Sequence, residues 1–215
     1  MKKRSFYTAL GLLAAFALWT VAVTQVDVQP IGPLGSSVGL ATINRLVHQL
    51  TGVHIQLYVV TDWLGLVPVA FGSGFAALGC IQWIRRKSIL KVDRSILALG
   101  VFYVVVVAAY LLFESVVINY RPVLIEGRLE ASYPSSTTLL VLCVMPTALM
   151  QLRRRISNLR LRRLGSIVVG AFIAFMVLGR LVSGVHWLTD IIGGILLSGG
   201  LVMMYDSMRG GKNNG

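Results

Sequence analysis

The sequence is poor in charged residues, especially acidic ones, and in cysteine and histidine. Only 13% of its 215 residues are charged, eight are acidic, two are cysteines and three are histidines. A soluble domain usually has roughly 25% charged residues, so this composition argues against one. The two cysteines, Cys80 and Cys143, lie in separate apolar segments and show neither metal-ligand spacing nor a disulfide framework. We expect both to be small hydrophobic residues in the core or facing lipid.

Apolar residues are abundant, at 56% of the chain, and the mean hydropathy is +0.78. A helix needs about 20 mainly apolar residues to cross a bilayer, and irregular backbone cannot face lipid. The sequence therefore predicts an all-α, polytopic helical bundle with six transmembrane helices, forming a single membrane domain over residues 1–215. The expected spans are approximately 6–26, 58–82, 96–118, 135–152, 164–182 and 188–206.

The formal net charge of +12 invites comparison with nucleic-acid-binding proteins, but the basic clusters lack the stacking aromatics such binding needs. We therefore expect no nucleic-acid partner. In a six-span topology, 16 of the 20 cations fall on one side, which the positive-inside rule assigns to the cytoplasm together with both termini. These cations are Lys2, Lys3, Arg4, Arg85, Arg86, Lys87, Lys91, Arg94, Arg153, Arg154, Arg155, Arg160, Arg162, Arg163, Arg209 and Lys212.

The basic N-terminus followed by an apolar run is similar to a signal peptide. The run is long for that purpose and has no clear small-x-small cleavage site, so we interpret it as an uncleaved first span. The compact chain without organelle signals favours a bacterial plasma (inner) membrane. The sequence indicates no particular oligomeric state.

The first outer loop, residues 27–57, begins with chain-breaking prolines and glycines. Residues 38–50 then show helical spacing of apolar side chains, which predicts a short amphipathic helix lying in the membrane interface. His48 and His54 belong to this loop, and we interpret them as polar residues that the interface tolerates.

Four cations remain for the outer side: Arg45, Arg121, Arg128 and Arg180. Arg121 follows the third span and Arg180 lies near the end of the fifth, where a charge is costly and usually functional. His186 and Asp190 have the i, i+4 spacing that places them on one helix face, so the carboxylate can orient the imidazole.

These residue types suit a phosphate site. Arginine binds phosphate oxygens in bidentate fashion, and a histidine backed by a carboxylate is a competent nucleophile or base. Pro134 suits a helix start, and the hydroxyl-rich segment 135–138 can cap that helix and offer amides to an anion. The alternative is a buried ion pair between Arg180 and Asp190 that joins the last two spans.

Together, Arg121-Pro122, Pro134-Ser135 and the segment Gly-Arg-Leu-Val-Ser-Gly-Val-His-Trp-Leu-Thr-Asp at 179–190 resemble the type 2 phosphatidic acid phosphatase family, membrane lipid phosphatase branch, over roughly residues 58–206. The resemblance implies six helices, a site on the non-cytoplasmic face, and neither metal nor cofactor. It implies that His186 forms a phosphohistidine and that Asp190 orients it. Arg121, Arg180, Ser135 and the amide of Ser136 would bind the phosphate of a lipid phosphate or diphosphate that arrives from the membrane.

Two positions depart from the family pattern. Glu114 stands where the first motif has lysine, and Thr137 stands where the second has the histidine that protonates the leaving oxygen. General acid catalysis contributes about 10²–10⁴ in rate, so its loss predicts impaired hydrolysis. A protonated Glu114 is one replacement donor, because burial raises a carboxyl pKa. Alternatively, Glu114 pairs with Arg121 or Arg128.

Three hypotheses follow. The chain is a lipid-phosphate hydrolase, or a catalytically impaired relative that binds or moves a lipid phosphate, or a partner-binding membrane protein whose arginines and Asp190 join helices.

Overall fold

The computed structural model describes residues 2–208, so Arg209 and Lys212 lie outside the described part of the chain. Apart from three isolated β-bridges in the loops, this part is helical and contains no named strand. The α-helices are α1 (Lys3–Gln25), α2 (Ala41–Thr51), α3 (Ile55–Leu64), α4 (Leu66–Arg86), α5 (Arg94–Ser115), α6 (Ser136–Arg155), α7 (Leu159–Val182) and α8 (Leu188–Met208), with 3₁₀ turns at Pro33–Gly35 and Ile89–Lys91.

Six segments within residues 2–208 are long and apolar enough to cross a membrane, which confirms the six predicted spans. The second is longer than expected, because α3 and α4 together form one segment, Ile55–Arg86. Gly65 separates the two helices, and its amide donates to the carbonyls of both Thr61 and Asp62. Pro68 follows in the first turn of α4, where a missing amide costs no helical hydrogen bond.

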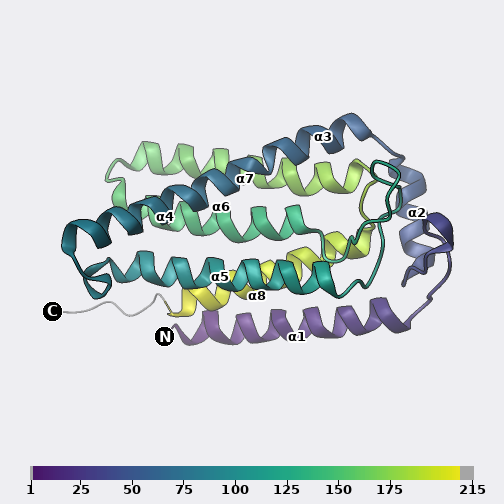
Figure 1. Ribbon diagram of the computed structural model, residues 1–215, viewed down its shortest axis with the longest axis horizontal. Coiled ribbons are helices and arrows are strands. Elements are labelled where there is room, and N and C mark those ends of the chain that lie inside the picture. Colours follow the sequence, from purple (N-terminus) through teal and green to yellow (C-terminus); the bar gives the residue numbers. More distant parts are fainter. Residues whose placement is uncertain (1, 209–215) are drawn as a thin grey trace.

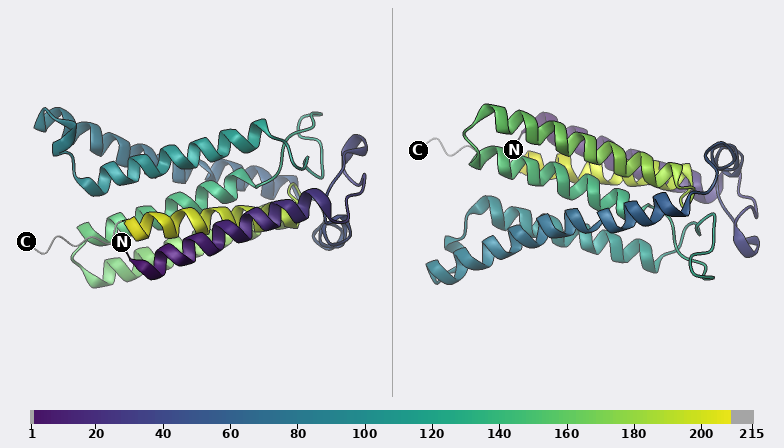
Figure 2. Two further views of the ribbon diagram at one scale, coloured as in Figure 1. Left: turned by 90° about the horizontal axis from the view of Figure 1, so that it is seen from below. Right: turned by 90° about the horizontal axis from the view of Figure 1, so that it is seen from above.

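The helices run roughly side by side, with all the long inter-helix loops at one end (Figure 1). The N-terminus and the α4–α5 and α6–α7 connections lie at the opposite end, so the described basic segments gather there. We call these the loop end and the basic end. Figure 2 shows α1 lying along α8, and an ion pair between Lys2 and Asp206, 2.9 Å apart, joins them at the basic end.

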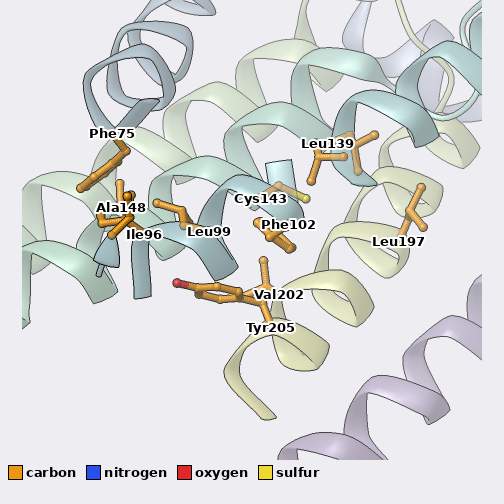
Figure 3. Packing of buried hydrophobic residues seen from close by; sticks show 12 residues of the cluster. Phe75, Ile96, Leu99, Phe102, Leu139, Cys143, Ala148, Leu197, Val202 and Tyr205 are labelled. Carbon is orange, nitrogen blue, oxygen red and sulfur yellow. The ribbon is translucent and has the colours of Figure 1, made fainter. Parts of the chain in front are cut away.

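The principal apolar core lies where α4, α5, α6 and α8 meet (Figure 3). Phe102 and Tyr205 pack there with ring centroids 5.0 Å apart, and Cys143 is fully buried beside them. Cys80 is exposed. Cys143 is thus a core residue and Cys80 faces outward, and both positions were expected for small hydrophobic residues in a membrane bundle.

The helix expected at 38–50 is present as α2, with Asn44 and His48 turned toward the bundle and Arg45 and Gln49 exposed. Asn44 is fully buried, and its side chain exchanges hydrogen bonds with the hydroxyl and amide of Thr189 at 3.0 and 3.2 Å. Leu46 and Leu50 are 55% and 77% exposed. The apolar side therefore faces outward, where lipid would cover it, while the polar side holds the start of α8.

Candidate active site

His186 lies at the loop end, in the short connection 183–187 between α7 and α8. Hydrogen bonds from the first outer loop hold this connection on one side: the His54 amide donates to the Ser183 carbonyl at 2.9 Å, and His48 Nε2 lies 3.1 Å from the Gly184 carbonyl oxygen. The His48 side chain, set aside as a tolerated polar residue, therefore supports the loop that carries His186, whereas His54 does so only through its backbone amide.

Gly184 is the one residue of this connection whose backbone requires glycine. Its φ is +68°, and a Cβ there would lie 2.0 Å from the Gly52 carbonyl oxygen. We expect Gly184→Ala to destabilise the loop by about 1–3 kcal/mol, because both the left-handed backbone and the contact must relax. The measurement is the thermal unfolding midpoint of the purified variant. Gly127→Ala is the control, since it shares a positive φ but meets nothing within 4 Å.

Asp190 begins α8 and faces both His186 and the backbone. Its Oδ2 accepts a 2.9 Å hydrogen bond from the Trp187 amide, which is the reciprocal half of a capping box. The same oxygen lies 3.7 Å from His186 Nδ1, longer than a hydrogen bond. Asn119 donates to Asp190 Oδ1 at 3.4 Å. The carboxylate is therefore fixed by the helix start and aimed at the imidazole. The two residues do not share a helix face as predicted, because α8 begins at Leu188 and His186 lies in the loop before it.

Arg180 and Arg121 converge on the other side of His186. Arg180 Nη2 lies 3.2 Å from His186 Nε2, and the Arg180 side chain is 1% exposed. Arg121 is 9% exposed, and its Nε lies 3.0 Å from Glu130 Oε2. The Arg180–Asp190 ion pair considered above does not form: Arg180 pairs instead with Asp62, 3.5 Å away.

Tyr58 and Asp62 of α3 complete the site, and neither was identified from the sequence. The Tyr58 ring lies beneath both guanidiniums, 4.9 Å from Arg180 Cζ and 5.8 Å from Arg121 Cζ. Gly179 brings α3 this close, since a Cβ there would lie 2.8 Å from Thr61 Cγ2. One signal was available: Asp62 is a carboxylate inside an apolar run, which by default marks a functional position.

We expect the Tyr58 ring to hold the two like-charged guanidiniums in place through cation–π attraction. Tyr58→Leu should weaken phosphate binding about three- to 30-fold, whereas Tyr58→Phe, which keeps the ring, should retain most of it. Inorganic phosphate titrated against the thermal midpoint gives both affinities. Equal loss in the two variants would mean that the hydroxyl, and not the ring, is required.

The site is electropositive, and several of its buried nitrogen atoms lack hydrogen-bond partners. Arg121 Nη1, Arg180 Nε and His186 Nδ1 are buried atoms without a hydrogen-bond partner within residues 2–208. Buried polar atoms are nearly always paired, so such a group of donors suits an anionic ligand. Burial, followed by the positive charges of Arg180 and Arg121, lowers the pKa of His186 well below its ordinary value. The imidazole is therefore neutral at neutral pH, as a nucleophile must be.

The hydroxyl segment opens α6 beside this group. Ser135 Oγ caps α6 by accepting from the Thr138 amide at 3.5 Å, and the Ser135 amide donates to the Asp190 carbonyl at 3.1 Å. Ser136 and the exposed Glu114 line a small cavity with Tyr133, and Thr137 lies half-buried in the first turn. The suggested pairing of Glu114 with Arg121 or Arg128 is not among the ion pairs of residues 2–208, in which Arg121 pairs with Glu130. No group of three or more His, Cys, Asp or Glu side chains that could hold a metal occurs within residues 2–208.

We compared the fold and the sequence of the chain with those of known proteins. A crystal structure of a transmembrane PAP2-type phosphatidylglycerolphosphate phosphatase from Bacillus subtilis is similar, with a TM-score of 0.61 over 94% of this chain and 96% of that one. The identity is 16%, so the likeness shows a shared fold. No curated protein matched significantly. Residues 114–210 match the PAP2 superfamily, a segment that contains every motif residue named above and excludes Tyr58 and Asp62. This match confirms the resemblance noted in the motifs of the chain.

Proposed function

We propose that the chain is a membrane lipid-phosphate phosphatase that forms a phosphohistidine at His186. The observation that carries this proposal is that buried Arg180 contacts the imidazole edge opposite Asp190, while Arg121 lies over the same Tyr58 ring as Arg180. His186 Nε2 faces Arg180 at 3.2 Å while Nδ1 faces Asp190 at 3.7 Å. Nε2 is thus the atom positioned to attack phosphorus, and Asp190 is positioned to stabilise the positive charge that develops on the ring.

The reaction has two steps. Nε2 attacks the phosphorus, the bond to the lipid oxygen breaks, and the leaving oxygen takes a proton from water, because Thr137 cannot supply one. Water then attacks the phosphohistidine, releasing inorganic phosphate and restoring the neutral imidazole. Arg121 and Arg180 stabilise the charge on the equatorial oxygens in both steps, with Ser135 and the Ser136 amide as further donors.

A lipid substrate suits the surroundings of the site. A cavity of about 520 Å³ lies between α3 and the 119–134 loop, and it includes Tyr58 and Asp62 beside Arg180. Its remaining lining is mostly apolar: Ile55, Val59, Trp63, Leu124 and Ile125, with Glu126 at the edge. Such a space can hold the apolar part of a lipid phosphate or diphosphate while the phosphate meets the arginines. We propose a bacterial plasma membrane as the location, and the positive-inside rule predicts that the loop end lies outside the cytoplasm and the basic end inside it.

The second candidate function is binding or movement of a lipid phosphate without hydrolysis. Thr137 favours it, because a threonine hydroxyl cannot serve as a general acid at neutral pH. Glu114 favours it as well, because an exposed carboxylate replaces a motif cation. In this case a lipid phosphate would raise the thermal midpoint through Arg180, but no phosphate would be released.

The deciding experiment is a phosphate-release panel on purified protein with phosphatidate, phosphatidylglycerol phosphate and a polyprenyl diphosphate. We expect Thr137→His to raise the release rate at pH 6 at least tenfold, as a first part of the about 10²–10⁴ that a well-placed general acid contributes. Thr137→Asn is the control, because it is polar but cannot donate a proton at this pH. A Thr137→His variant no faster than the asparagine variant would show that the missing acid is not what limits hydrolysis.

A further inference from the structure

Six arginines at the basic end have no acidic residue near them in sequence. Arg153, Arg154, Arg155, Arg160, Arg162 and Arg163 surround the α6–α7 connection, and residues 131–189 contain neither Asp nor Glu. Setting membrane topology needs only that the cations lie near this end, without any particular arrangement. The structure nevertheless shows a built arrangement at three of them.

A cavity of about 370 Å³ lies at this end between α6 and α7, within the usual size range of ligand sites. It is lined by Arg153, Leu159, Arg162, Arg163, Ser166 and Ile167. Arg153 Nε and Nη2 both donate to Ser166 Oγ, at 3.2 and 2.6 Å, and that hydroxyl donates to the Arg162 carbonyl at 2.6 Å. The guanidinium of α6 is thereby held against α7 beside the other two arginines.

The start of α7 adds to the positive potential. Asn158 caps this helix by accepting from the amides of Arg160 and Leu161 at 2.9 and 3.3 Å. The amide end of a 24-residue helix carries a partial positive charge, so an anion beside it is favoured by both the dipole and the arginines.

The walls of the cavity indicate which anion fits. Leu159 and Ile167 are each 68% exposed, and Leu164 on the same helix is 57% exposed. Outward-facing apolar side chains on a spanning helix are lipid contacts, so the ligand combines an anionic group with acyl chains. We propose that this cavity binds the phosphodiester head group of an anionic phospholipid, as basic pockets between membrane helices do. This site is separate from the proposed active site at the loop end.

The test uses the full chain in detergent, titrated with dioleoyl phosphatidylglycerol or dioleoyl phosphatidylcholine. Phosphatidylglycerol should raise the thermal unfolding midpoint and phosphatidylcholine should not. The double variant Arg153→Gln/Arg162→Gln should weaken the apparent affinity for phosphatidylglycerol by about tenfold or more. Arg153→Lys/Arg162→Lys, which keeps both charges, should retain the lipid preference.

The matched control is Arg4→Gln/Arg85→Gln, which removes the same charge from exposed positions at the same end but outside the cavity. Its affinity should stay within about twofold of the wild type. Equal weakening in this control would overturn the proposal in favour of diffuse surface charge, and equal stabilisation by phosphatidylcholine would overturn it as well. Glycerophosphoglycerol, the head group without chains, should have little effect; an equally large shift would overturn the lipid assignment in favour of a free-anion site.

Two further measurements separate this site from the active site and from folding defects. The phosphatidylglycerol preference should persist in Arg180→Gln, whether or not the chain hydrolyses lipid phosphates. Native mass spectrometry of the unaltered chain should show phosphatidylglycerol retained in preference to phosphatidylcholine. Retention of both lipids alike would contradict the proposal even if the glutamine variant did not fold.

Discussion

His186→Ala should lower phosphate release from a lipid phosphate by at least about 10³-fold, on the scale seen when hydrolases lose their nucleophile. The imidazole is 2% exposed, and its Nε2 lies 3.2 Å from Arg180 Nη2, so a phosphate held by Arg180 would lie beside the proposed nucleophile. His54→Asn is the matched control, because His54 lies at the same end with its ring on the Thr51 carbonyl. Its rate should stay within about twofold of the wild type. Unchanged release in His186→Ala would rule out the phosphohistidine mechanism.

The pH dependence provides a second readout of the same residue. Burial and the neighbouring arginines lower the pKa of His186 below 6.5 in the free protein, so the neutral nucleophile persists at mildly acidic pH. We expect the acid limb of kcat/KM, which reports the free enzyme, to lie below pH 6.5. The folded state binds fewer protons than the unfolded state in this range. The contribution of His186 to the free energy of unfolding therefore declines as the pH falls through 6.5 and is smallest at low pH.

Arg180→Gln should weaken binding of inorganic phosphate about 10- to 100-fold, the value of one charge-assisted hydrogen bond lost from a buried site. Arg180→Lys should recover little of the loss, because lysine lacks the planar fork and its stacking on Tyr58. Isothermal titration or a thermal shift with phosphate gives both affinities. Arg128→Gln is the control, since it removes an exposed cation from the same end of the bundle.

Asp62→Asn should strengthen phosphate binding, which is opposite to the effect of Arg180→Gln. The Asp62 carboxylate lies 3.5 Å from Arg180 Nη1 and is 58% exposed, so its competition with phosphate for the guanidinium is screened by solvent. We expect the variant to bind phosphate up to about fivefold more tightly. Weaker binding in Asp62→Asn would instead show that the carboxylate is needed to position Arg180.

Much of the fold could be predicted, because each span is a local property of about 20 consecutive residues. The helix boundaries were less accurate. The second span begins at Ile55 and not near 58, since its first turns carry polar residues that hydropathy discounts. The break at Gly65 was missed as well. A glycine and a proline three residues apart in an apolar run are compatible with either a continuous or a divided helix, and packing decides between them.

The site was predicted only where its residues lie close in sequence or match a motif. Arg180, His186 and Asp190 lie within 11 consecutive residues, so the sequence places them near one another. The loop and the start of α8, and not one helix face, bring the histidine beside the carboxylate. Tyr58 lies more than 100 residues away from them along the chain, and nothing local links it to a guanidinium. The contact exists because Gly179 lets α3 approach α7.

The sequence alone therefore determined the membrane bundle, its six spans, the gathering of cations at one end and the identity of the candidate nucleophile. Each depends on composition or on residues that lie close together in the sequence. Tertiary structure decided the partners of the charges: Arg180 with Asp62, Arg121 with Glu130, and Arg153 with Ser166. Ion pairs and hydrogen bonds act over a few ångströms, and which side chains come that close depends on how the helices pack.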